Sequence, residues 1–386
     1  MPRLESKLSP RANLLICALI AAIAAALIAS SFRELPSARK DFYDNIWAPA
    51  NLLVHGQNPY SSAGIKTGLP TLWLPMALGV LLPLGMLDAD AAARIWFIIS
   101  VIEAASIVLL AQGEARKPTI TVIAALILYL FPATIQHFVL GQFALTAALC
   151  LMLAARLAGR GRDWEAAFLL ALASSKPQLA FLAGIGLLYF YWRRSGLRGS
   201  ALFGGRFALC TLVLTLPMLA SPAPWFSAWW ENMRNNPAWL HPSLFALLRD
   251  WLGAWGYATY AAIAILGLAA CIWVWRQDQP EKAMLWTLAL TTIIAPYVWS
   301  WDFILLMPLW IAAFARADWR EKLLLLVVYA AGWLGMAAVQ QFDQAKNQAF
   351  WWVPLWFTMG MLATRVQALR RAAPADREAE SLSVEH

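Results

Sequence analysis

The sequence predicts an all-α protein that crosses a membrane many times, because its composition is too apolar for a soluble domain. Of its 386 residues, 61% are hydrophobic and 13% are charged, whereas soluble domains are usually about 45–50% apolar and about 25% charged. Apolar runs of roughly 15–22 residues follow one another almost to the C-terminus, as in polytopic helical membrane proteins. The 22 tryptophans fit this class, since tryptophan is favoured at the membrane–water interface.

The apolar runs predict about 12 transmembrane helices, within a range of about 11–13. They lie near residues 14–31, 91–111, 119–136, 142–158, 164–174, 178–192, 201–219, 257–275, 283–297, 302–315, 323–339 and 350–364. The first run lacks a small-residue cleavage site followed by a soluble domain, so it is expected to be a retained anchor. Residues 1–372 are expected to form one membrane domain, and the polar tail 373–386 is expected to be disordered.

Two parts of this pattern depart from simple spans. The stretch 70–87 contains three prolines, and because proline weakens a straight helix we expect this stretch to be re-entrant or interfacial. The runs 164–174 and 178–192 flank Lys176 and are shorter than the roughly 20 residues of a full crossing. They are expected to form a hairpin whose tip lies below the outer surface, or else one long helix broken at Pro177.

The lysine and arginine residues give these segments an orientation. With the N-terminus inside, most of the 30 basic residues fall in short loops on the inner side, as the positive-inside rule expects for a multi-pass protein of the cell (inner) membrane. The outer face then carries 33–69, 220–256 and 297–301, and the first two are expected to hold interfacial helices. The basic residues of these loops account for the net charge of +8. The charge therefore does not indicate a nucleic-acid partner, and none is expected.

The sequence gives no sign of metal, nucleotide or thiol chemistry. The four cysteines all lie in apolar runs without a Cys-x-x-Cys pair, and the four histidines have no metal-ligand spacing. There is also no phosphate-binding glycine loop and no nucleophile elbow. We therefore expect no metal site and no cofactor.

Two carboxylates, Asp41 and Asp44, follow the first apolar run and would share one face of a helix. Such a pair can act as a general base, a metal ligand or a proton relay. The alternative is a solvated interfacial turn in which Asp41 pairs with Arg39 or Lys40.

Lys176 and Gln142 are the next candidates, because both lie at tips between apolar runs. A lysine between two apolar half-spans either snorkels to the surface or holds an anion such as a carboxylate or a phosphate. Gln142 follows Gly141, with His137 about one turn earlier. The alternative for Gln142 is a buried amide that is satisfied by neighbouring backbone.

Other outer-face residues have both a structural and a functional interpretation. Asp302 opens a helix after the tip that contains Trp299, so it is either an N-cap or a site residue. Asn58 and Tyr60 belong to a segment rich in turn-forming residues, which alone predicts a plain turn.

The candidates share one side of the membrane in the predicted layout. An acid beside a sunken cation at the lipid–water boundary suits group transfer from a lipid-linked phosphate. The acid would take a proton from the acceptor hydroxyl, and the cation would stabilise the departing phosphate.

The order of these landmarks resembles glycosyltransferase family 87, membrane mannosyltransferases of the GT-C superfold that use polyprenyl-phosphate sugars. The resemblance covers residues 38–310 and rests on Asp41-Phe42-Tyr43, Ala50-Asn51-Leu52-Leu53, Gly56, Pro59-Tyr60, Leu72 to Leu84, Leu140-Gly141-Gln142, Ser175-Lys176-Pro177-Gln178 and Pro296-Tyr297 to Asp302. Two departures are Leu69-Pro70-Thr71, where the family has Tyr-Pro-Pro, and Pro49 inside the expected short helix.

The resemblance implies a GT-C-like glycosyltransferase of the cell envelope. Its donor would be a sugar, mannose or another hexose or pentose, on polyprenyl phosphate, and its acceptor a glycolipid or polysaccharide at the outer, periplasmic face. Asp41 would be the catalytic base of a metal-independent, inverting reaction, with Asp44 in support. The implied substrate-binding residues are Asn58, Tyr60, His137, Gln142, Lys176, Gln178, Trp299 and Asp302.

Two other functions compete with this interpretation. A transporter or lipid flippase would line a path across the membrane with its charges, and polar groups would be expected on both faces. An inactive scaffold for envelope assembly would tolerate Asp41→Asn without any change in envelope sugars. The gathering of polar residues on one side favours the enzyme.

Overall fold

The computed structural model describes residues 40–61, 71–221, 224–235, 241–277, 279–342 and 347–364, together with residue 18. Within these residues the chain folds into helices and connecting turns, without strands. This agrees with the predicted all-α membrane class. The predicted anchor 14–31, apart from residue 18, and the predicted polar tail 373–386 lie outside the described residues.

The helical segments follow one another closely along the chain. They are α2 Lys40–Phe42, η2 Tyr43–Trp47, α3 Ala48–Val54, α4 Met76–Gly85, α5 Ala89–Gln112, η4 Gly113–Ala115, α6 Pro118–Leu130, α7 Pro132–Leu140, α8 Ala144–Gly159, α9 Asp163–Ala173, α10 Pro177–Thr215, η5 Leu216–Ala220, α11 Trp225–Arg234, α12 Leu244–Leu252, α13 Ala254–Gln277, α14 Pro280–Ile294, η6 Ser300–Leu306, α15 Met307–Arg316, α16 Trp319–Phe342 and η7 Asn347–Phe350. Residues 353–364 are also helical.

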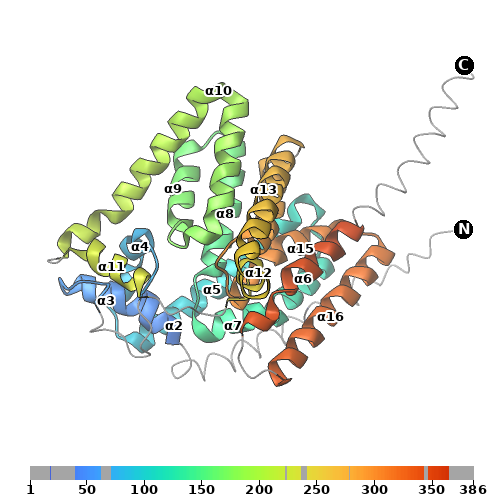
Figure 1. Cartoon of the computed structure of the whole chain (residues 1–386), viewed down its shortest axis with the longest axis horizontal. Coiled ribbons are helices and arrows are strands. Elements are labelled where there is room, and N and C mark those ends of the chain that lie inside the picture. The colour runs from blue at the N-terminus through green and yellow to red at the C-terminus, as the bar shows by residue number, and fades with distance from the viewer. Residues whose placement is uncertain are drawn as a thin grey trace, which may run out of the picture.

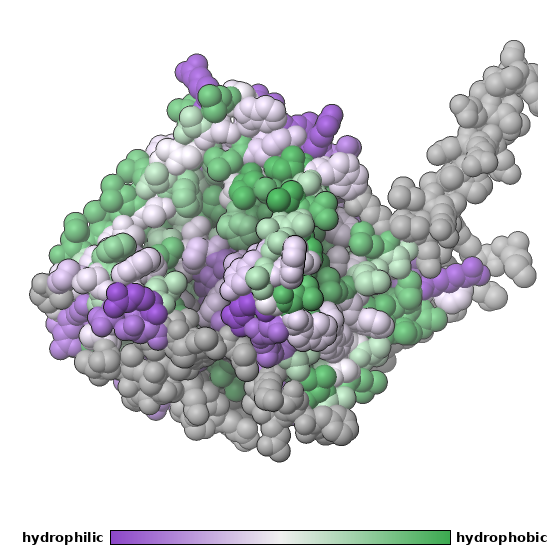
Figure 2. All heavy atoms as spheres, viewed as in Figure 1, coloured by the Kyte–Doolittle hydropathy of each residue, from purple (hydrophilic) through white to green (hydrophobic). Residues whose placement is uncertain are grey.

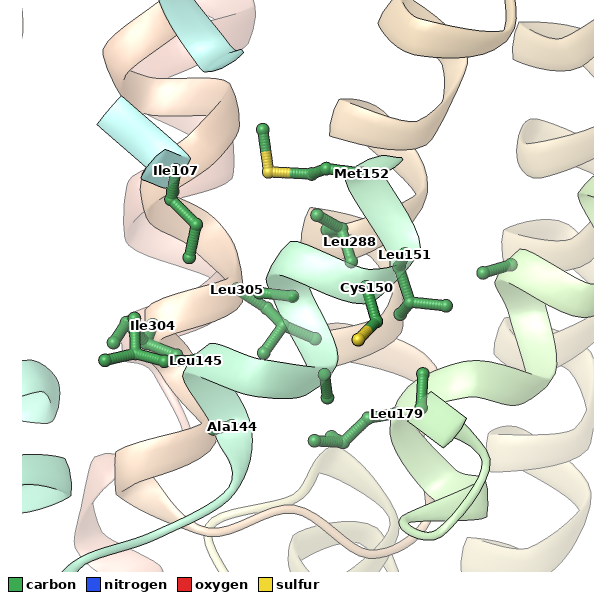
Figure 3. Packing of buried hydrophobic residues seen from close by; sticks show 14 of the residues in the cluster. Ile107, Ala144, Leu145, Cys150, Leu151, Met152, Leu179, Leu288, Ile304 and Leu305 are labelled. Carbon is green, nitrogen blue, oxygen red and sulfur yellow. The ribbon is translucent and has the colours of Figure 1, made fainter. Parts of the chain in front are cut away.

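The core of the molecule lies where α8 packs against its neighbours. Helices α5, α9, α10 and α14 and the segment η6 all contact α8. Figure 3 shows Leu145 and Leu151 of α8 among Leu288 of α14 and Leu305 of η6, and all four side chains are fully buried. Alanines along α8 are buried as well, and small side chains allow membrane helices to approach closely.

Four described helices are long and apolar enough to cross a membrane. They are Ala89–Ala115, Pro177–Ala220, Ala254–Gln277 and Trp319–Gln340, and a fifth is formed if Pro118–Leu130 and Pro132–Leu140, bent by 63°, count as one span. This supports a polytopic helical protein but not the predicted count of about 12 spans.

Helix length explains why the predicted count is not supported. The runs at 142–158, 164–174, 283–297 and 302–315 become helices of 16, 11 and 15 residues, and a 10-residue helix preceded by a 3-10 segment. Each is shorter than the roughly 20 residues that a straight crossing needs. Hydropathy alone does not distinguish such a short buried helix from a span.

The helix α10 contains a sharp turn between the two runs predicted at 178–192 and 201–219. Ser195 and Gly196 have non-helical dihedral angles, and Gly196 has a φ of 63°, which glycine adopts without a Cβ clash. Beyond the turn, the ring of Phe203 stacks on Tyr191 with 4.4 Å between the centroids. Figure 1 shows α10 rising beside α9, turning at the top and descending again.

The stretch predicted to be re-entrant or interfacial contains one short helix, α4, within its described part. Ten residues at about 1.5 Å each span about 15 Å, half of the roughly 30 Å hydrocarbon core. The side chain of Asn51 donates to the carbonyl of Gly85 at 2.8 Å, and this hydrogen bond ties α3 to α4. The two short helices therefore form one unit beside the longer ones.

Basic side chains gather at one end of the helices. Arg193 donates to the carbonyls of Trp275 and Arg276, and Arg156 pairs with Glu281. These contacts join the turn of α10 to the end of α13, and the end of α8 to the start of α14. The loops at 141–142, 174–176 and 296–299 lie at the opposite ends of the same helices.

The outer surface of the helices is strongly apolar, as Figure 2 shows on the face in view. Large exposed side chains include Ile102 of α5, Leu212 of α10 and Leu266 of α13, each 59–68% exposed. A soluble protein rarely exposes so much apolar surface, so this surface is suited to contact lipid. The short helices α11 and α12 add exposed tryptophans such as Trp230 and Trp251, in keeping with the predicted interfacial role of 220–256.

Candidate active site

A cavity of about 360 Å³ opens where the loops opposite the basic end meet. Its walls come from α2 and η2, from residues 72–74 before α4, and from the turn before α8. The α9–α10 tip, α11, and the loop before η6 with the start of η6 complete them. It is lined by Asp41, Asn45, Leu72, Trp73, Leu74, Gln142, Ser175, Lys176, Pro177, Gln178, Trp229, Met233, Tyr297, Trp299 and Trp301. Five of the ten predicted site residues thus line a single cavity.

The polar side chains of this cavity form one continuous chain. Gln142 donates from Nε2 to Oδ2 of Asp41, and its Oε1 accepts from Nζ of Lys176 at 2.9 Å. Lys176 also contacts Oδ1 of Asp302 at 3.3 Å. The two neighbours fix the orientation of the amide, because an ammonium has only donors and an ionised carboxylate only acceptors.

Lys176 is deeply buried rather than snorkelling. It is 3% exposed, and its ammonium lies 5.0 Å from the ring centre of Trp73. A buried charge is tolerated only when it is paired and hydrogen-bonded. Asp302 supplies the pairing, and the carbonyl of Gln142 supplies a second hydrogen bond.

Asp302 combines the two roles that the sequence left open. Its Oδ2 accepts from the backbone N–H of Trp299 at 3.0 Å, a helix-start contact, while Oδ1 faces Lys176. The side chain is fully buried behind the cavity. The start of η6 is therefore fixed by the same carboxylate that pairs with the ammonium.

Gln142 is positioned by the glycine before it. Gly141 has a φ of 70°, and a Cβ there would lie 2.5 Å from Cβ of Phe42, the neighbour of Asp41. The backbone N–H groups of Gly141 and Gln142 both donate to the carbonyl of His137. His137 itself is fully buried and does not line the cavity, so its backbone is what shapes this turn.

Only one of the two carboxylates that were expected to share a helix face, Asp41, lines the cavity. The helix widens at η2, where the N–H of Ala48 donates to the carbonyl of Tyr43, five residues back. Pro49 follows directly and has no N–H to donate, which favours this widening. Asp41 lines the cavity with Asn45, whereas Asp44 is 1% exposed and does not line it.

Asn58 and Tyr60 lie outside the cavity and support one of its walls. The Asn58 side chain accepts from the N–H of Tyr60 at 3.0 Å, which shapes the turn. The Tyr60 hydroxyl donates to the carbonyl of Trp73 at 2.8 Å. Both residues therefore hold Trp73 in place beside Lys176.

Aromatic rings form much of the cavity wall. Trp299 and Trp301 stack with 4.9 Å between the ring centres, and Trp229 of α11 donates to the carbonyl of Leu72 at 3.2 Å. Sequence reasoning missed Trp73, Trp229 and Trp301 as site residues. The tryptophan-rich segment 220–256 was a signal for Trp229, but interfacial anchoring is the commoner use of such residues.

Burial shifts the ionisation of Asp41, which lies outside the candidate spans. The loss of water raises its pKa to about 6, while Lys176 and the hydrogen bond from Gln142 lower it, and Asp44 and Asp302 raise it further. A carboxyl with a pKa near the working pH can accept a proton efficiently in catalysis. Among the described residues, no group of three or more histidine, cysteine, aspartate or glutamate side chains is placed to hold a metal.

The fold and this cavity define a class: a polytopic helical membrane protein with a buried acid–amide–cation chain at one end of its helices. The family model for Glycosyltransferase family 87 matches residues 72–300, more than half of the chain. The chain belongs to glycosyltransferase family 87 and is a membrane glycosyltransferase. No curated protein matches it. Gln142, Lys176 and Trp299 lie within the matched residues, and Asp41 precedes them.

The contact between Gly141 and Phe42 gives a test of the site geometry. We expect Gly141→Ala to lower the free energy of unfolding by about 1–3 kcal/mol more than Gly56→Ala, because overpacking adds to the strain of a positive φ. Gly56 is the matched control, since its φ is 67° and nothing lies within 4 Å of an added Cβ. Unfolding of both purified variants in detergent, followed by tryptophan fluorescence, measures the difference. Equal losses would contradict the close approach.

Proposed function

We propose that the protein transfers a sugar, mannose or another hexose or pentose, from a polyprenyl-phosphate donor to a glycolipid or polysaccharide of the cell envelope. Asp41 is the general base in this proposal. The observation that carries it is the chain Asp41–Gln142–Lys176 in one cavity, which places a proton acceptor and a cation on the two ends of one amide.

The proposed reaction uses both ends of that chain. Asp41 takes the proton of the acceptor hydroxyl as the oxygen attacks the anomeric carbon of the donor sugar. The bond from that carbon to the phosphate oxygen breaks, and the electron pair leaves with polyprenyl phosphate. One negative charge develops on the leaving phosphate, and the ammonium of Lys176 stabilises it.

The remaining cavity residues suit a carbohydrate and its phosphate. The faces of Trp299, Trp301 and Trp229 offer flat apolar surfaces to sugar rings. Gln178 and Asn45 also line the cavity, and their amides can donate to and accept from sugar hydroxyls. We assign the sugar to this polar and aromatic part and the phosphate to the side of Lys176.

The distribution of charge supports an outward-facing site. The arginine-rich helix ends lie opposite the cavity, and the positive-inside rule assigns such ends to the cytoplasm. The cavity would then open to the outer face of the cell membrane, where the proposed glycolipid or polysaccharide acceptor is available.

The packing beneath the cavity favours an enzyme over a transporter or flippase. Figure 3 shows Ala144, Leu179 and Ile304 among the hydrophobic side chains of this core, and each is at most 1% exposed. A path for a polar substrate would need polar groups or water in this region. These packed apolar side chains instead close the cavity from one side.

The base assignment predicts unequal effects of two conservative substitutions. We expect Asp41→Asn to lower sugar transfer by about 10²- to 10⁴-fold, because an amide cannot accept the acceptor's proton. Asp44→Asn is the control and is expected to cost less, since Asp44 does not line the cavity. The measurement compares glycans and glycolipids of a deletion strain complemented with each variant, with protein levels checked in the membrane.

Full transfer by Asp41→Asn would rule out Asp41 as the base. A larger loss in Asp44→Asn than in Asp41→Asn would assign the base to the other carboxylate.

The raised pKa of Asp41 predicts an acid limb in the pH profile. A base works only when ionised, so kcat/KM should fall as the pH drops through the pKa of about 6. Lys176→Gln removes the ammonium that lowers the pKa of Asp41. The fall in kcat/KM should therefore begin at a higher pH, and the transfer rate should be lower throughout. Sugar-transfer rates of the wild type and of Lys176→Gln, measured in membranes from acidic to neutral pH, would show this shift. An unshifted limb in Lys176→Gln would contradict the coupling between the two residues.

A further inference from the structure

A second cavity, of about 350 Å³, lies at the turn of α10. Its lining includes Asp163, Tyr191, Arg194, Arg198, Leu202 and Arg206. Helix α10 begins next to Lys176 and runs away from the first cavity before it turns at Ser195 and Gly196. The second cavity therefore lies at the opposite, basic end of the helices.

The charges of this cavity do not balance. Asp163 accepts a hydrogen bond from Arg206 and another from the hydroxyl of Tyr191 at 2.8 Å, so its carboxylate is already engaged. Arg194 and Arg198 make no hydrogen bond or ion pair with any residue in the described ranges. Two guanidinium groups thus remain available in one cavity, and guanidinium groups bind phosphate oxygens in pairs of hydrogen bonds.

Exposed apolar and aromatic side chains also lie near the cavity. Leu197, Leu202 and Trp192 are 78%, 52% and 51% exposed. The guanidinium of Arg206 lies 5.6 Å from the ring centre of Trp164, which is 51% exposed. In Figure 2 hydrophilic residues cap the top of the molecule over the turn of α10, above a hydrophobic surface.

This combination fits a lipid better than a free ion. A free phosphate needs only the cations, whereas a phospholipid places a charged headgroup above acyl chains that require apolar surface. Basic pockets between membrane helices at the cytoplasmic side bind anionic headgroups in this manner.

We propose that the cavity at the α10 turn binds the phosphate headgroup of an anionic membrane lipid, at the membrane face opposite the glycosyl-transfer site. The arginines Arg194 and Arg198 hold the phosphate, and the exposed leucines and tryptophans contact the acyl chains. The proposal does not depend on the identity of the donor, the acceptor or the catalytic base.

The test measures thermal unfolding of the purified full chain in mild detergent as lipid is added. Phosphatidylglycerol is expected to raise the unfolding midpoint, and phosphatidylcholine with the same acyl chains is expected to raise it less. In Arg194→Gln/Arg198→Gln the phosphatidylglycerol concentration for half of the effect should rise at least about tenfold. Both side chains are exposed, so their replacement leaves the packing intact, and Arg198→Gln alone should give a smaller change in the same direction.

The control variant is Arg160→Gln/Arg276→Gln. It removes the same charge from exposed positions at the same end of the helices, outside the lining of the cavity, and is expected to keep the lipid response. Equal losses in both double variants would overturn the site, because they would indicate diffuse surface charge. Equal stabilisation by phosphatidylcholine would also overturn it, and equal stabilisation by inorganic phosphate alone would overturn the lipid as the source of the phosphate.

Discussion

The buried ammonium of Lys176 is the constraint on which the candidate site depends. A charge that is 3% exposed must be paired and hydrogen-bonded, and its partners come from distant parts of the chain. Gln142 precedes α8, and Asp302 belongs to η6. Pairing therefore requires the start of α8, the α9–α10 tip and the loop before η6 to meet at one point. The same arrangement brings Gln142 into contact with Asp41, and the cavity lies beside this pair.

This arrangement also explains why the surroundings of Asp41 shift its pKa in both directions. Burial disfavours the ionised form of Asp41, whereas the nearby ammonium and the amide of Gln142 favour it. The balance leaves the pKa of Asp41 raised to about 6, which suits the general base that we propose. Arginines at the far end of the helices, such as Arg156 and Arg193, do not line the cavity.

Much of this organisation was predictable from the sequence because the apolar runs and the charges between them are local signals. The turn between 178–192 and 201–219, the hairpin around Lys176 and the gathering of Asp41, Gln142, Lys176 and Asp302 all follow from them. Other features depend on tertiary packing. The helix widens at 43–47, and Asn45, which was not among the predicted site residues, lines the cavity. Trp73 reached the site through contacts with Tyr60, and hydropathy does not separate short buried helices from full spans.

The most direct test of the central claim is a double-mutant cycle on the buried ion pair. Lys176→Met and Asp302→Asn each leave one buried charge without its partner, which costs about 3–5 kcal/mol, whereas removing both charges is often nearly neutral. Unfolding of the two single variants and the double variant in detergent measures the coupling. The double variant should be at least as stable as the less stable single variant. Losses that simply add would show that Lys176 and Asp302 are not coupled, and would contradict the account.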